Sequence, residues 1–354
     1  MLTPSWRAIV AIARGWGKGP QIPSIFPSAH PRTTHPRTTH PRTTHPPHMH
    51  RLLLLPLLLA ACARPAAVPR ASDGEPYTLV WSDEFTGDGS LDTAHWAYEN
   101  GFVRNQELQW YQPENAARVN GMLVIEGRRE RKPNPRYAAP GNAGAATANA
   151  PGRAWRNREF IDYTSASVNT RGKHAWLYGR FEIRARIDVR TGSWPAFWTL
   201  GARGPWPANG EVDIMEFYDD TLLFNVAWGG ANGAVWNSVK VRRDRFPAGW
   251  ENQFHTWRMD WDERAIRLYM DDSLMNTQDL SKTINAPRSG SGGAAPAMDN
   301  PFHGPAYILI NQAIGGQHGG DPASTRMPLR YEVDYVRVWQ TKAQIEATRR
   351  AARR

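Results

Sequence analysis

The sequence predicts an all-β sandwich, and two observations indicate this fold class. From Tyr77 to Gln340 the chain consists of short segments in which apolar and polar residues alternate, the pattern of half-buried strands. Gly, Pro, Asn and Asp separate these segments, and no amphipathic helix is indicated before residue 341. With 354 residues, 41% of them hydrophobic, the chain can bury a sizeable core. About a dozen strands without helices between them are typical of a sandwich or jelly roll.

The individual strands follow from their own alternation. In the segment 180–188, Phe181, Ile183 and Ile187 point to one side while charged residues point to the other. Comparable runs predict strands at 122–126, 165–170, 211–216, 254–261, 265–270, 307–311 and 331–339. Residues 131–156 are rich in Pro, Gly, Ala and Asn, and we expect them to form a long exposed loop that walls a cleft. The basic tail 341–354 is expected to form a short surface helix.

Basic charge is concentrated at the two ends of the chain. The 43 Lys and Arg against 33 Asp and Glu give a net charge of +10 and a pI near 9.9. Seven of the basic residues lie in 1–61, which holds no acid, and four more are arginines in 349–354. The remaining 32 basic residues nearly balance the 33 acids, so a basic groove in the fold is excluded as the cause of the pI. We therefore expect no nucleic-acid partner.

Residues 1–76 are predicted to direct the protein and not to fold with it. Residues 1–48 contain a His-Pro-Arg-Thr-Thr repeat and are expected to lie upstream of a true start at Met49; a His-rich metal-binding tract is the alternative. Residues 49–61 have a basic start and an apolar run of about ten residues, too short to span a bilayer at about 20. This segment is predicted to be a signal peptide.

The only cysteine, Cys62, follows Leu59-Ala60-Ala61, and these four residues resemble a bacterial lipoprotein box. Cys62 would then be acylated after cleavage, and residues 62–76, rich in Ala and Pro, would tether the domain to the outer membrane. We expect an exported lipoprotein, in the periplasm or at the cell surface. The alternative is an ordinary signal peptide and a secreted protein. A single cysteine also excludes intrachain disulfides and Cys-rich zinc sites.

Three acids lie within one apolar strand, at Glu211, Asp213 and Glu216. In a regular strand Glu211 and Asp213 share a face and Glu216 points to the opposite one. A β-bulge at residues 214–215 would return Glu216 to the face of the other two, and bulges are frequent beside active sites. The sequence therefore predicts a bulged strand that presents three carboxylates together.

Such a trio suits the hydrolysis of a glycosidic bond. Mutual repulsion makes at least one carboxyl group hold its proton more tightly, while another stays ionised. Glycoside hydrolysis needs this combination of nucleophile and acid, and a spacing of about 5 to 5.5 Å between them gives retention at the anomeric carbon. From the pattern alone, a solvent-facing strand and a carboxylate cation site remain alternatives.

Tryptophans cluster in the sequence around the acid strand. Sugar rings have apolar faces that stack on indole, so tryptophans beside paired acids suggest a polysaccharide track, although core packing is the ordinary role of most of them. We expect Trp194 and Trp198 to be exposed in the cleft, with Trp110 and Trp228 behind them.

Several ordered motifs resemble glycoside hydrolase family 16, the laminarinase-like β-glucanases and their relatives. The motifs are Trp194-Pro-Ala-Phe-Trp-Thr-Leu-Gly201, Trp206-Pro-Ala-Asn-Gly-Glu-Val-Asp-Ile-Met-Glu216, Trp81-Ser-Asp-Glu-Phe85, Asn105-Gln-Glu-Leu-Gln109, Tyr178-Gly-Arg-Phe-Glu-Ile-Arg-Ala185, Phe254-His-Thr-Trp257, Ala313-Ile-Gly-Gly316 and Val333-Asp-Tyr-Val-Arg-Val338. The resemblance covers nearly all of residues 77–340. It implies a β-jelly roll of two curved antiparallel sheets, with an open substrate cleft on the concave face and cleavage inside polysaccharide chains.

The resemblance also implies roles for single residues. Glu211 would be the nucleophile, Glu216 the general acid/base, and Asp213 would assist by hydrogen bonding to the nucleophile. The bulged six-residue spacing matches the laminarinase branch. Asn105 and Glu107 would bind substrate. No cofactor is implied for catalysis, but relatives often hold a structural calcium, which here would be bound by Glu84, the backbone of Gly121, and Asp334.

One departure affects the expected substrate. Many laminarinases have a histidine on the strand after the acids, whereas Asn225 and Trp228 occupy that region here and are the expected substrate-binding residues. We expect an endo-acting, retaining β-glycanase on β-1,3- or β-1,3(4)-glucan, working as a monomer whose partner is polysaccharide. The alternatives are a β-galactan-cleaving enzyme for agar, porphyran, carrageenan or lactosamine chains, a non-catalytic carbohydrate-binding jelly roll, and an inert surface lipoprotein.

Overall fold

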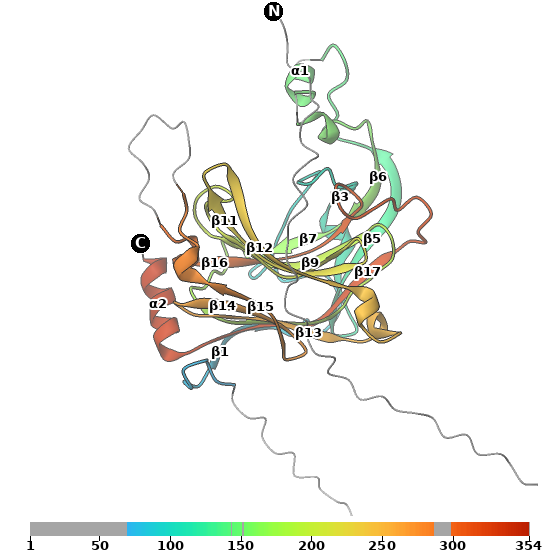
Figure 1. Ribbon diagram of the computed structural model, residues 1–354. Coiled ribbons are helices and arrows are strands. Elements are labelled where there is room, and N and C mark those ends of the chain that lie inside the picture. The colour runs from blue at the N-terminus through green and yellow to red at the C-terminus, as the bar shows by residue number, and fades with distance from the viewer. Residues whose placement is uncertain (1–68, 143, 151, 287–298, 354) are drawn as a thin grey trace, which may run out of the picture. The chain divides into compact units, whose positions relative to one another are not determined.

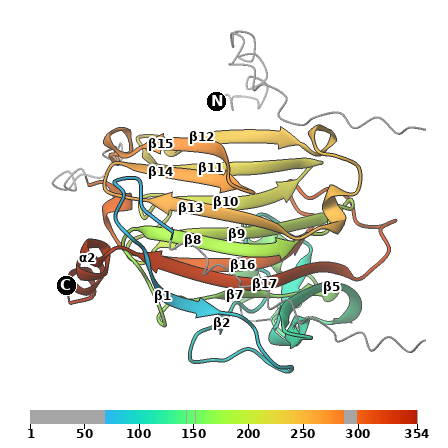
Figure 2. The ribbon, with the colours of Figure 1, turned by 90° about the horizontal axis from the view of Figure 1, so that it is seen from below.

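The computed structural model describes residues 69–142, 144–150, 152–286 and 299–353. The predicted low-complexity segment, the signal peptide, Cys62 and most of the tether lie outside these residues. Within them the strands run from Thr78 to Gln340 and form two sheets stacked face to face (Figures 1 and 2). The predicted all-β sandwich is confirmed.

The larger sheet has ten strands, seen from below in Figure 2. Along its path these are β15 (Ser273–Asp279), β14 (Ala265–Met270), β13 (His255–Trp261), β8 (Gly179–Arg186), β17 (Leu329–Gln340), β5 (Met122–Pro133), β6 (Phe160–Ser165) and β3 (Gln109–Tyr111). β1 (Thr78–Asp83) pairs with β17, and β4 (Ala116–Val119) pairs with β5. The pairs are antiparallel except for β3 with β6, which are parallel.

The smaller sheet has seven strands, and all its pairs are antiparallel. Their order is β12 (Gly233–Arg242), β11 (Thr221–Gly230), β10 (Glu211–Tyr218), β9 (Ser193–Gly201), β16 (Ala306–Ile314), β7 (Ser167–Asn169) and β2 (Ala97–Tyr98). The sequence did not predict β9, β11, β12 or β15 as separate strands. β9 lacks the alternation because both of its faces are buried over most of its length.

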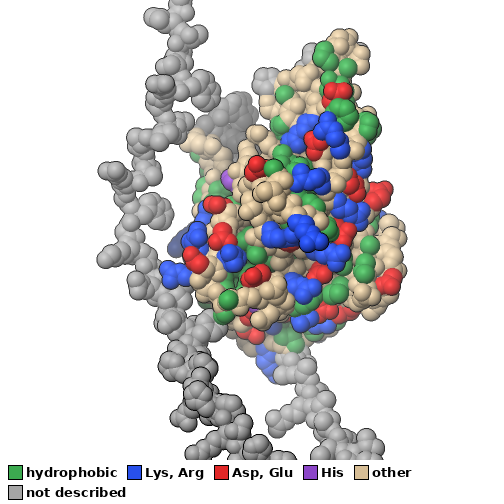
Figure 3. All heavy atoms as spheres, turned by 90° about the vertical axis from the view of Figure 1, so that its right-hand side faces the viewer, with side chains coloured by type: hydrophobic (Ala, Val, Ile, Leu, Met, Phe, Trp, Pro, Cys, Tyr) green, Lys and Arg blue, Asp and Glu red, His purple; other side chains and the backbone are tan. Residues whose placement is uncertain are grey.

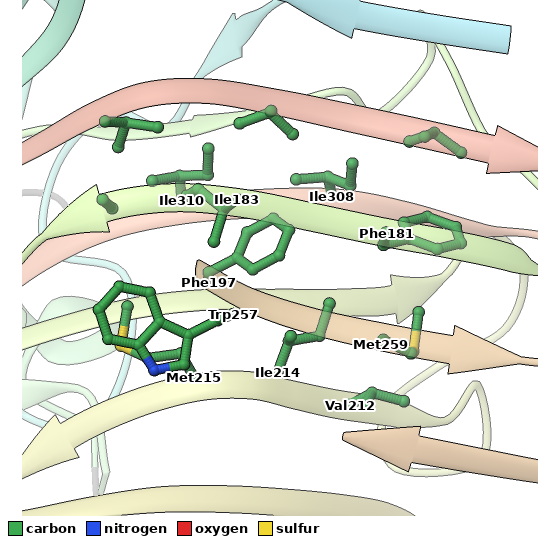
Figure 4. Packing of buried hydrophobic residues seen from close by; sticks show 14 of the residues in the cluster. Phe181, Ile183, Phe197, Val212, Ile214, Met215, Trp257, Met259, Ile308 and Ile310 are labelled. Carbon is green, nitrogen blue, oxygen red and sulfur yellow. The ribbon is translucent and has the colours of Figure 1, made fainter. Parts of the chain in front are cut away.

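The core lies between the two sheets, where each contributes one face. Phe181, Ile183 and Trp257 from the larger sheet meet Phe197 and Ile308 from the smaller one, and all five side chains are inaccessible to solvent (Figure 4). Burying a large apolar side chain contributes about 1.5–3 kcal/mol. Because strand residues alternate between faces, this core leaves the other face of the smaller sheet free to form a site.

Helices are short and peripheral. The predicted C-terminal helix is present as α2 (Lys342–Ala352), which begins at a capping box formed by Thr341 and Gln344. The other helix is α1 (Ala145–Ala148), and single 3-10 turns occur at η1 (Pro113–Asn115), η2 (Ala154–Arg156), η3 (Arg243–Arg245), η4 (Trp250–Asn252), η5 (Leu280–Lys282) and η6 (Pro301–His303). In the described ranges, no helix has the length and apolar character needed to cross a bilayer.

The insertion predicted at 131–156 lies at residues 134–159 between β5 and β6, because β5 continues to Pro133, and we call it the lobe. None of its described residues lines the catalytic cleft, contrary to the prediction. The lobe contains α1 and η2 and projects beyond the sheets near β3 and β6 (Figure 1). Arginines fasten it to the loop 103–108: Arg158 Nη1 donates to Leu108 O at 3.2 Å, and Arg156 Nη2 donates to Val103 O at 2.5 Å. The lobe therefore supports a loop that the next section places at the cleft.

Candidate active site

The predicted bulge is present in β10. The pairing of β10 with β11 shifts between Asp213 and Glu216, and its pairing with β9 shifts between Asp213 and Met215. Ile214 and Met215, neighbours in the chain, both point into the core (Figure 4). Two consecutive core residues reverse the alternation, so Glu216 returns to the face of Glu211 and Asp213, and all three acids line one cleft.

Hydrogen bonds hold each carboxylate of this trio in place. The indole Nε1–H of Trp206 donates to Glu211 at 2.8 Å, and that of Trp194 donates to Glu216 at 2.6 Å. Asp213 accepts a bond of 3.0 Å from the side-chain amide of Asn225. The carboxyl group of Asp213 lies close enough to that of Glu211 for its charge to raise the pKa of Glu211. The two groups therefore do not lose their protons independently of each other.

Burial and mutual repulsion raise the pKa values of the three acids. Burial raises the pKa of Asp213 to about 6, against the opposing effect of the hydrogen bonds from Asn225 and Glu211. Burial, and then the charge of Asp213, raise the pKa values of both Glu211 and Glu216 well above the ordinary glutamate value. The site therefore holds its protons to a higher pH than free carboxylic acids do, as an acid catalyst must.

The cleft around the trio has a volume of about 690 Å³ and is formed mainly by the smaller sheet. Its lining residues are Arg104, Asn105, Glu107, Trp194, Ala196, Trp198, Leu200, Trp206, Glu211, Asp213, Glu216, Tyr218, Leu223, Asn225, Trp236, Ser238, Lys240, Asn311, Gln317 and His318. The predicted residues Asn105, Glu107, Trp194, Trp198 and Asn225 are all among them. With the three acids, eight of the twenty lining residues were predicted from the sequence.

The exposed tryptophans differ from those predicted. Trp194 and Trp198 are 4% and 8% exposed, so they form the floor of the cleft and offer little surface to a sugar. Trp206 and Trp236, which we did not predict as binding residues, are 49% and 45% exposed. Trp206 follows β9 in a loop, and Trp236 lies on the edge strand β12. These two indoles are the platforms available for stacking.

Two predicted cleft residues lie elsewhere. Trp228 packs against the core cluster, because in the regular strand β11 it faces the opposite side from Asn225, three positions earlier. Trp110 is buried against Phe102 in a separate hollow beneath the lobe. The prediction that these two tryptophans bind substrate in the cleft is wrong.

The loop 103–108 and the loop after β16 close one end of the cleft together. The backbone N–H of Gln317 donates to Asn105 O at 3.0 Å. Gly316 has a φ of +74°, and a Cβ there would lie 2.8 Å from Asn105 O, so only glycine permits this close approach. Beside it, the His318 ring stacks on Tyr218 with centroids 5.0 Å apart, next to Trp194. This aromatic cluster borders Glu216.

The residues expected to bind calcium lie on the larger sheet. Glu84 accepts two hydrogen bonds from the guanidinium of Arg337, at 2.9 and 2.8 Å, and Asp334 pairs with Arg184 at 2.5 Å. In this arrangement Glu84 and Asp334 do not fit a cation site, because a cation would have to displace the guanidinium groups of Arg337 and Arg184. Over the described residues, no group of three or more His, Cys, Asp or Glu is arranged to hold a metal ion. The calcium site stays a prediction.

Comparisons with known proteins agree with this geometry. A family model described as "Glycosyl hydrolases family 16" matches residues 108–290. A beta-glucanase of Rhodothermus marinus is 34% identical, covering 82% of this chain and 95% of the relative. A glucan endo-1,3-beta-glucosidase of Cryptopygus antarcticus is 30% identical, covering 80% and 97%. A solved structure from a study of endo-acting O-glycanases with which human gut microbiota initiate mucin breakdown is 31% identical, covers 79% and 96%, and has a TM-score of 0.65.

Proposed function

The chain belongs to glycosyl hydrolases family 16, and from that premise we propose that it is a retaining endo-β-glycanase that hydrolyses β-1,3- or β-1,3(4)-glucan. The observation that carries the proposal is the bulge in β10, which brings Glu216 into one cleft with Glu211 and Asp213. The two curated relatives are named for β-glucan hydrolysis, and the second of them for endo-1,3 cleavage.

In the first step Glu211 acts as the nucleophile and Glu216 as the acid. An ionised oxygen of Glu211 attacks the anomeric carbon while Glu216 gives its proton to the departing glycosidic oxygen, so the C–O bond to the leaving sugar breaks as the glycosyl-enzyme bond forms. In the second step Glu216, now ionised, takes a proton from water, whose oxygen attacks the same carbon and releases Glu211. Two inversions retain the anomeric configuration.

Asp213 acts through its neighbours. A proton on Glu211 can move to the neighbouring Asp213 as Glu211 ionises for attack, and the pair then carries one negative charge throughout. The amide of Asn225 stabilises the ionised form of Asp213 and thereby resists that transfer. We infer that Asp213 and Asn225 together set the pH at which the nucleophile becomes available.

A β-galactan or lactosamine-type substrate is the second candidate. Two observations favour it: the similarity to the structure from the mucin O-glycanase study, and Asn225 at the position where a histidine was expected for β-1,3-glucan cleavage. Asn225 bonds directly to Asp213 in the cleft, so this departure alters the wall that faces the sugar. The neutral β-glucans remain the first choice because both curated relatives carry that name.

One assay tests the function and the mechanism together. The protein is incubated with laminarin, lichenan and a lactosamine polymer, the products are sized, and the first-formed anomer is read by proton NMR. We expect internal cleavage of laminarin or lichenan with initial release of the β-anomer. Products from the lactosamine polymer alone would favour the second candidate, and no product from any polymer would favour a binding module.

Two variants separate the roles of the carboxylates. Glu211→Gln and Glu216→Gln are each expected to lower turnover on laminarin by about 10²–10⁴-fold or more, because each removes a proton-transfer or bond-forming group. On an aryl glycoside whose leaving group needs no proton, Glu216→Gln should still form the glycosyl-enzyme, seen as a burst of released phenol, and Glu211→Gln should not. The opposite pattern would exchange the assigned roles.

We also propose that the protein is exported and anchored through Cys62. The support is the sequence Leu59-Ala60-Ala61-Cys62, which follows a short apolar run. The test expresses the full chain and its Cys62→Ser variant in a bacterial host with radiolabelled palmitate. The wild type should incorporate label and stay in the membrane fraction, and the variant should do neither. Equal labelling of both would contradict the anchor.

A further inference from the structure

A second hollow, of about 520 Å³, lies beneath the lobe and outside the catalytic cleft. Its lining residues are Phe102, Trp110, Arg136, Gly144, Thr147, Ala148, Arg153, Arg156 and Asn157. Phe102 and Trp110 are buried and form its apolar base, while the three arginines are exposed at its rim. The proposed reaction makes no use of any of these side chains.

The lobe around the hollow carries a larger excess of basic residues than the rest of the domain. The lobe contains four arginines and one acid, Glu159, whereas residues 62–133 and 160–348 together contain 28 basic and 32 acidic residues. Arg131 and Lys132, at the end of β5, pair with acids, but over the described residues Arg136, Arg153 and Arg156 form no ion pair with a carboxylate. Figure 3 shows Lys and Arg side chains below the tip of the lobe, with Asp and Glu side chains between them. Three uncompensated guanidinium groups create a local positive potential that attracts anions.

Two of these arginines are already fixed in position. Arg136 donates to the backbone and side-chain oxygens of Asn100, at 3.1 and 2.7 Å, and its guanidinium lies 5.0 Å from the ring centre of Trp110. Arg156 donates to Val103 O and stacks on Trp155 at 4.8 Å. A guanidinium has five N–H donors, so both retain free donors. Binding an anion there loses little side-chain entropy, because the arginines are held in advance.

The hollow and the catalytic cleft share one wall. The segment 102–110 contributes Phe102 and Trp110 to the hollow, and Asn105 and Glu107 to the cleft. Arg156 and Arg158 bind the backbone of this segment from the side of the lobe. A polysaccharide that leaves the cleft across the segment 102–110 would therefore reach the cationic hollow.

We propose that this hollow is an accessory subsite for an anionic substituent, a sulfate ester or a carboxylate, on the polysaccharide that the cleft holds. Guanidinium groups bind both kinds of oxyanion through paired hydrogen bonds. This inference deepens the proposed function and rests on it: it assigns the enzyme to acidic β-glycans in addition to neutral ones.

The test uses laminarin of one chain length in three forms: unsubstituted, sulfated and carboxymethylated. Affinity is measured by titration calorimetry on Glu216→Gln, which does not degrade the probe. The anionic forms are expected to bind at least about tenfold more tightly than the unsubstituted form, because hydrogen bonds between guanidinium groups and oxyanions are charge-assisted and stronger than neutral ones. Comparison of the sulfated with the carboxymethylated probe shows which oxyanion the subsite prefers.

Two arginine variants and one control complete the test. Replacing Arg136, Arg153 and Arg156 by alanine together should abolish the preference for anionic probes. Arg153→Ala alone should weaken it severalfold; this exposed side chain makes no hydrogen bond in the described structure, so the variant will fold. Arg245→Ala removes an equal charge on η3 and should leave the preference intact. Melting temperatures confirm that each protein is folded.

Four results would overturn the accessory subsite. The first is equal affinity for all three probes when the arginines are intact, the second a preference that survives the triple variant, and the third equal weakening by Arg245→Ala. The fourth is binding of a DNA duplex as tightly as sulfated laminarin, because the hollow would then be a general polyanion surface. Hydrolysis of unsubstituted laminarin by the wild type is measured in parallel. Its absence would contradict the proposed function while arginine-dependent binding still supported the subsite.

Discussion

The indole of Trp194 donates a 2.6 Å hydrogen bond to the carboxylate of Glu216, so a residue of the cleft floor also lowers the pKa of this carboxyl group. Trp198, four residues further along β9, donates instead to the amide oxygen of Asn311 at 2.8 Å. Both indoles are buried in the same floor, but only the first meets a titrating group. Substituting each tryptophan in turn therefore distinguishes an effect of packing, which both share, from an effect on the pKa of Glu216, which only Trp194 has.

Trp194→Phe is expected to shift the basic limb of the pH profile of kcat/KM to higher pH. The hydrogen bond favours the ionised form of Glu216, so its loss raises the pKa of this group further. The general acid must be protonated, so activity persists to higher pH. Turnover at the optimum should fall by about 10- to 100-fold, because the carboxyl group loses a positioning contact. Trp198→Phe should leave the basic limb where it is; an equal shift would refute the assignment.

Trp206→Phe is expected to move the acidic limb instead. Trp206 donates to Glu211 at 2.8 Å and lowers its pKa, so without this bond the nucleophile ionises only at higher pH. Phenylalanine still stacks on a sugar, so KM should change by less than about tenfold. Trp236→Phe is the matched control, an equally exposed indole that bonds to no carboxylate. A stationary acidic limb in Trp206→Phe would contradict the role of this bond.

The position of the acids was predictable from sequence, whereas the choice of tryptophans was not. The spacing of Glu211, Asp213 and Glu216 around the apolar pair Ile214-Met215 admits one arrangement that keeps the acids together and the apolar residues buried, and the bulge follows. The orientation of Trp228 was also predictable, because a residue three positions after Asn225 in a regular strand faces the opposite side.

No sequence pattern indicated that Trp206 and Trp236 would be exposed in the cleft. Trp206 lies in the loop before β10, whose path depends on contacts far along the chain, such as the bond from Asn285 to Ala208 O. Trp236 lies on an edge strand where polar and apolar residues mix, and exposure there depends on which strand ends the sheet. The cationic hollow was hidden for the same reason, because Phe102 and Arg153 meet only in the folded lobe.

Glu216→Gln is expected to raise thermal stability at neutral pH. Burial, followed by the charge of Asp213, raises the pKa of Glu216, so the folded protein binds this proton more tightly than the unfolded chain does. Stability then falls as the pH rises from the unfolded-chain pKa, about 4.3, towards the raised folded value. Glutamine has no proton to release, so the variant escapes this loss.

The measurement compares the melting temperatures of the wild type and Glu216→Gln at pH 4 and pH 7. The variant's advantage should grow with pH, at about 2–4 °C for each kcal/mol in a domain of this size. Glu346→Gln, an exposed position on α2, should show no such growth. A difference that is constant across this range would show that Glu216 holds its proton no more tightly in the folded state.

Calcium removal tests the site expected on the larger sheet. Glu84 and Asp334 are each engaged by an arginine, so chelation with EDTA is expected to change the melting temperature by less than about 2 °C, or less than ~1 kcal/mol. Added calcium chloride should likewise have little effect. A fall of several degrees with EDTA, reversed by calcium and absent in Glu84→Gln, would instead establish that the ion displaces the arginines.

Deleting Met215 tests whether the bulge sets the geometry of the acids. The shortened strand alternates regularly, so the three acids stay on the cleft face and Val212 and Ile214 stay in the core. Asp213 and Glu216 already pair with residues two apart on β9, Trp198 and Ala196, so the deletion keeps their register and removes only the local kink and twist of the bulge. We expect the fold to persist and turnover on laminarin to fall by at least about 10²-fold, because this kink aims the carboxyl group of Glu216 and misplacement by even about 1 Å is costly.

Met215→Ala is the control that separates the backbone from the side chain. It removes the same buried methionine and should destabilise the protein by about 2–5 kcal/mol, but it leaves the extra residue in the strand and therefore the position of Glu216. Turnover of folded Met215→Ala should remain near that of the wild type. If the deletion kept wild-type turnover, the bulge would not determine catalysis. If the two variants lost turnover equally, core packing would be the cause, since only the deletion removes the bulge.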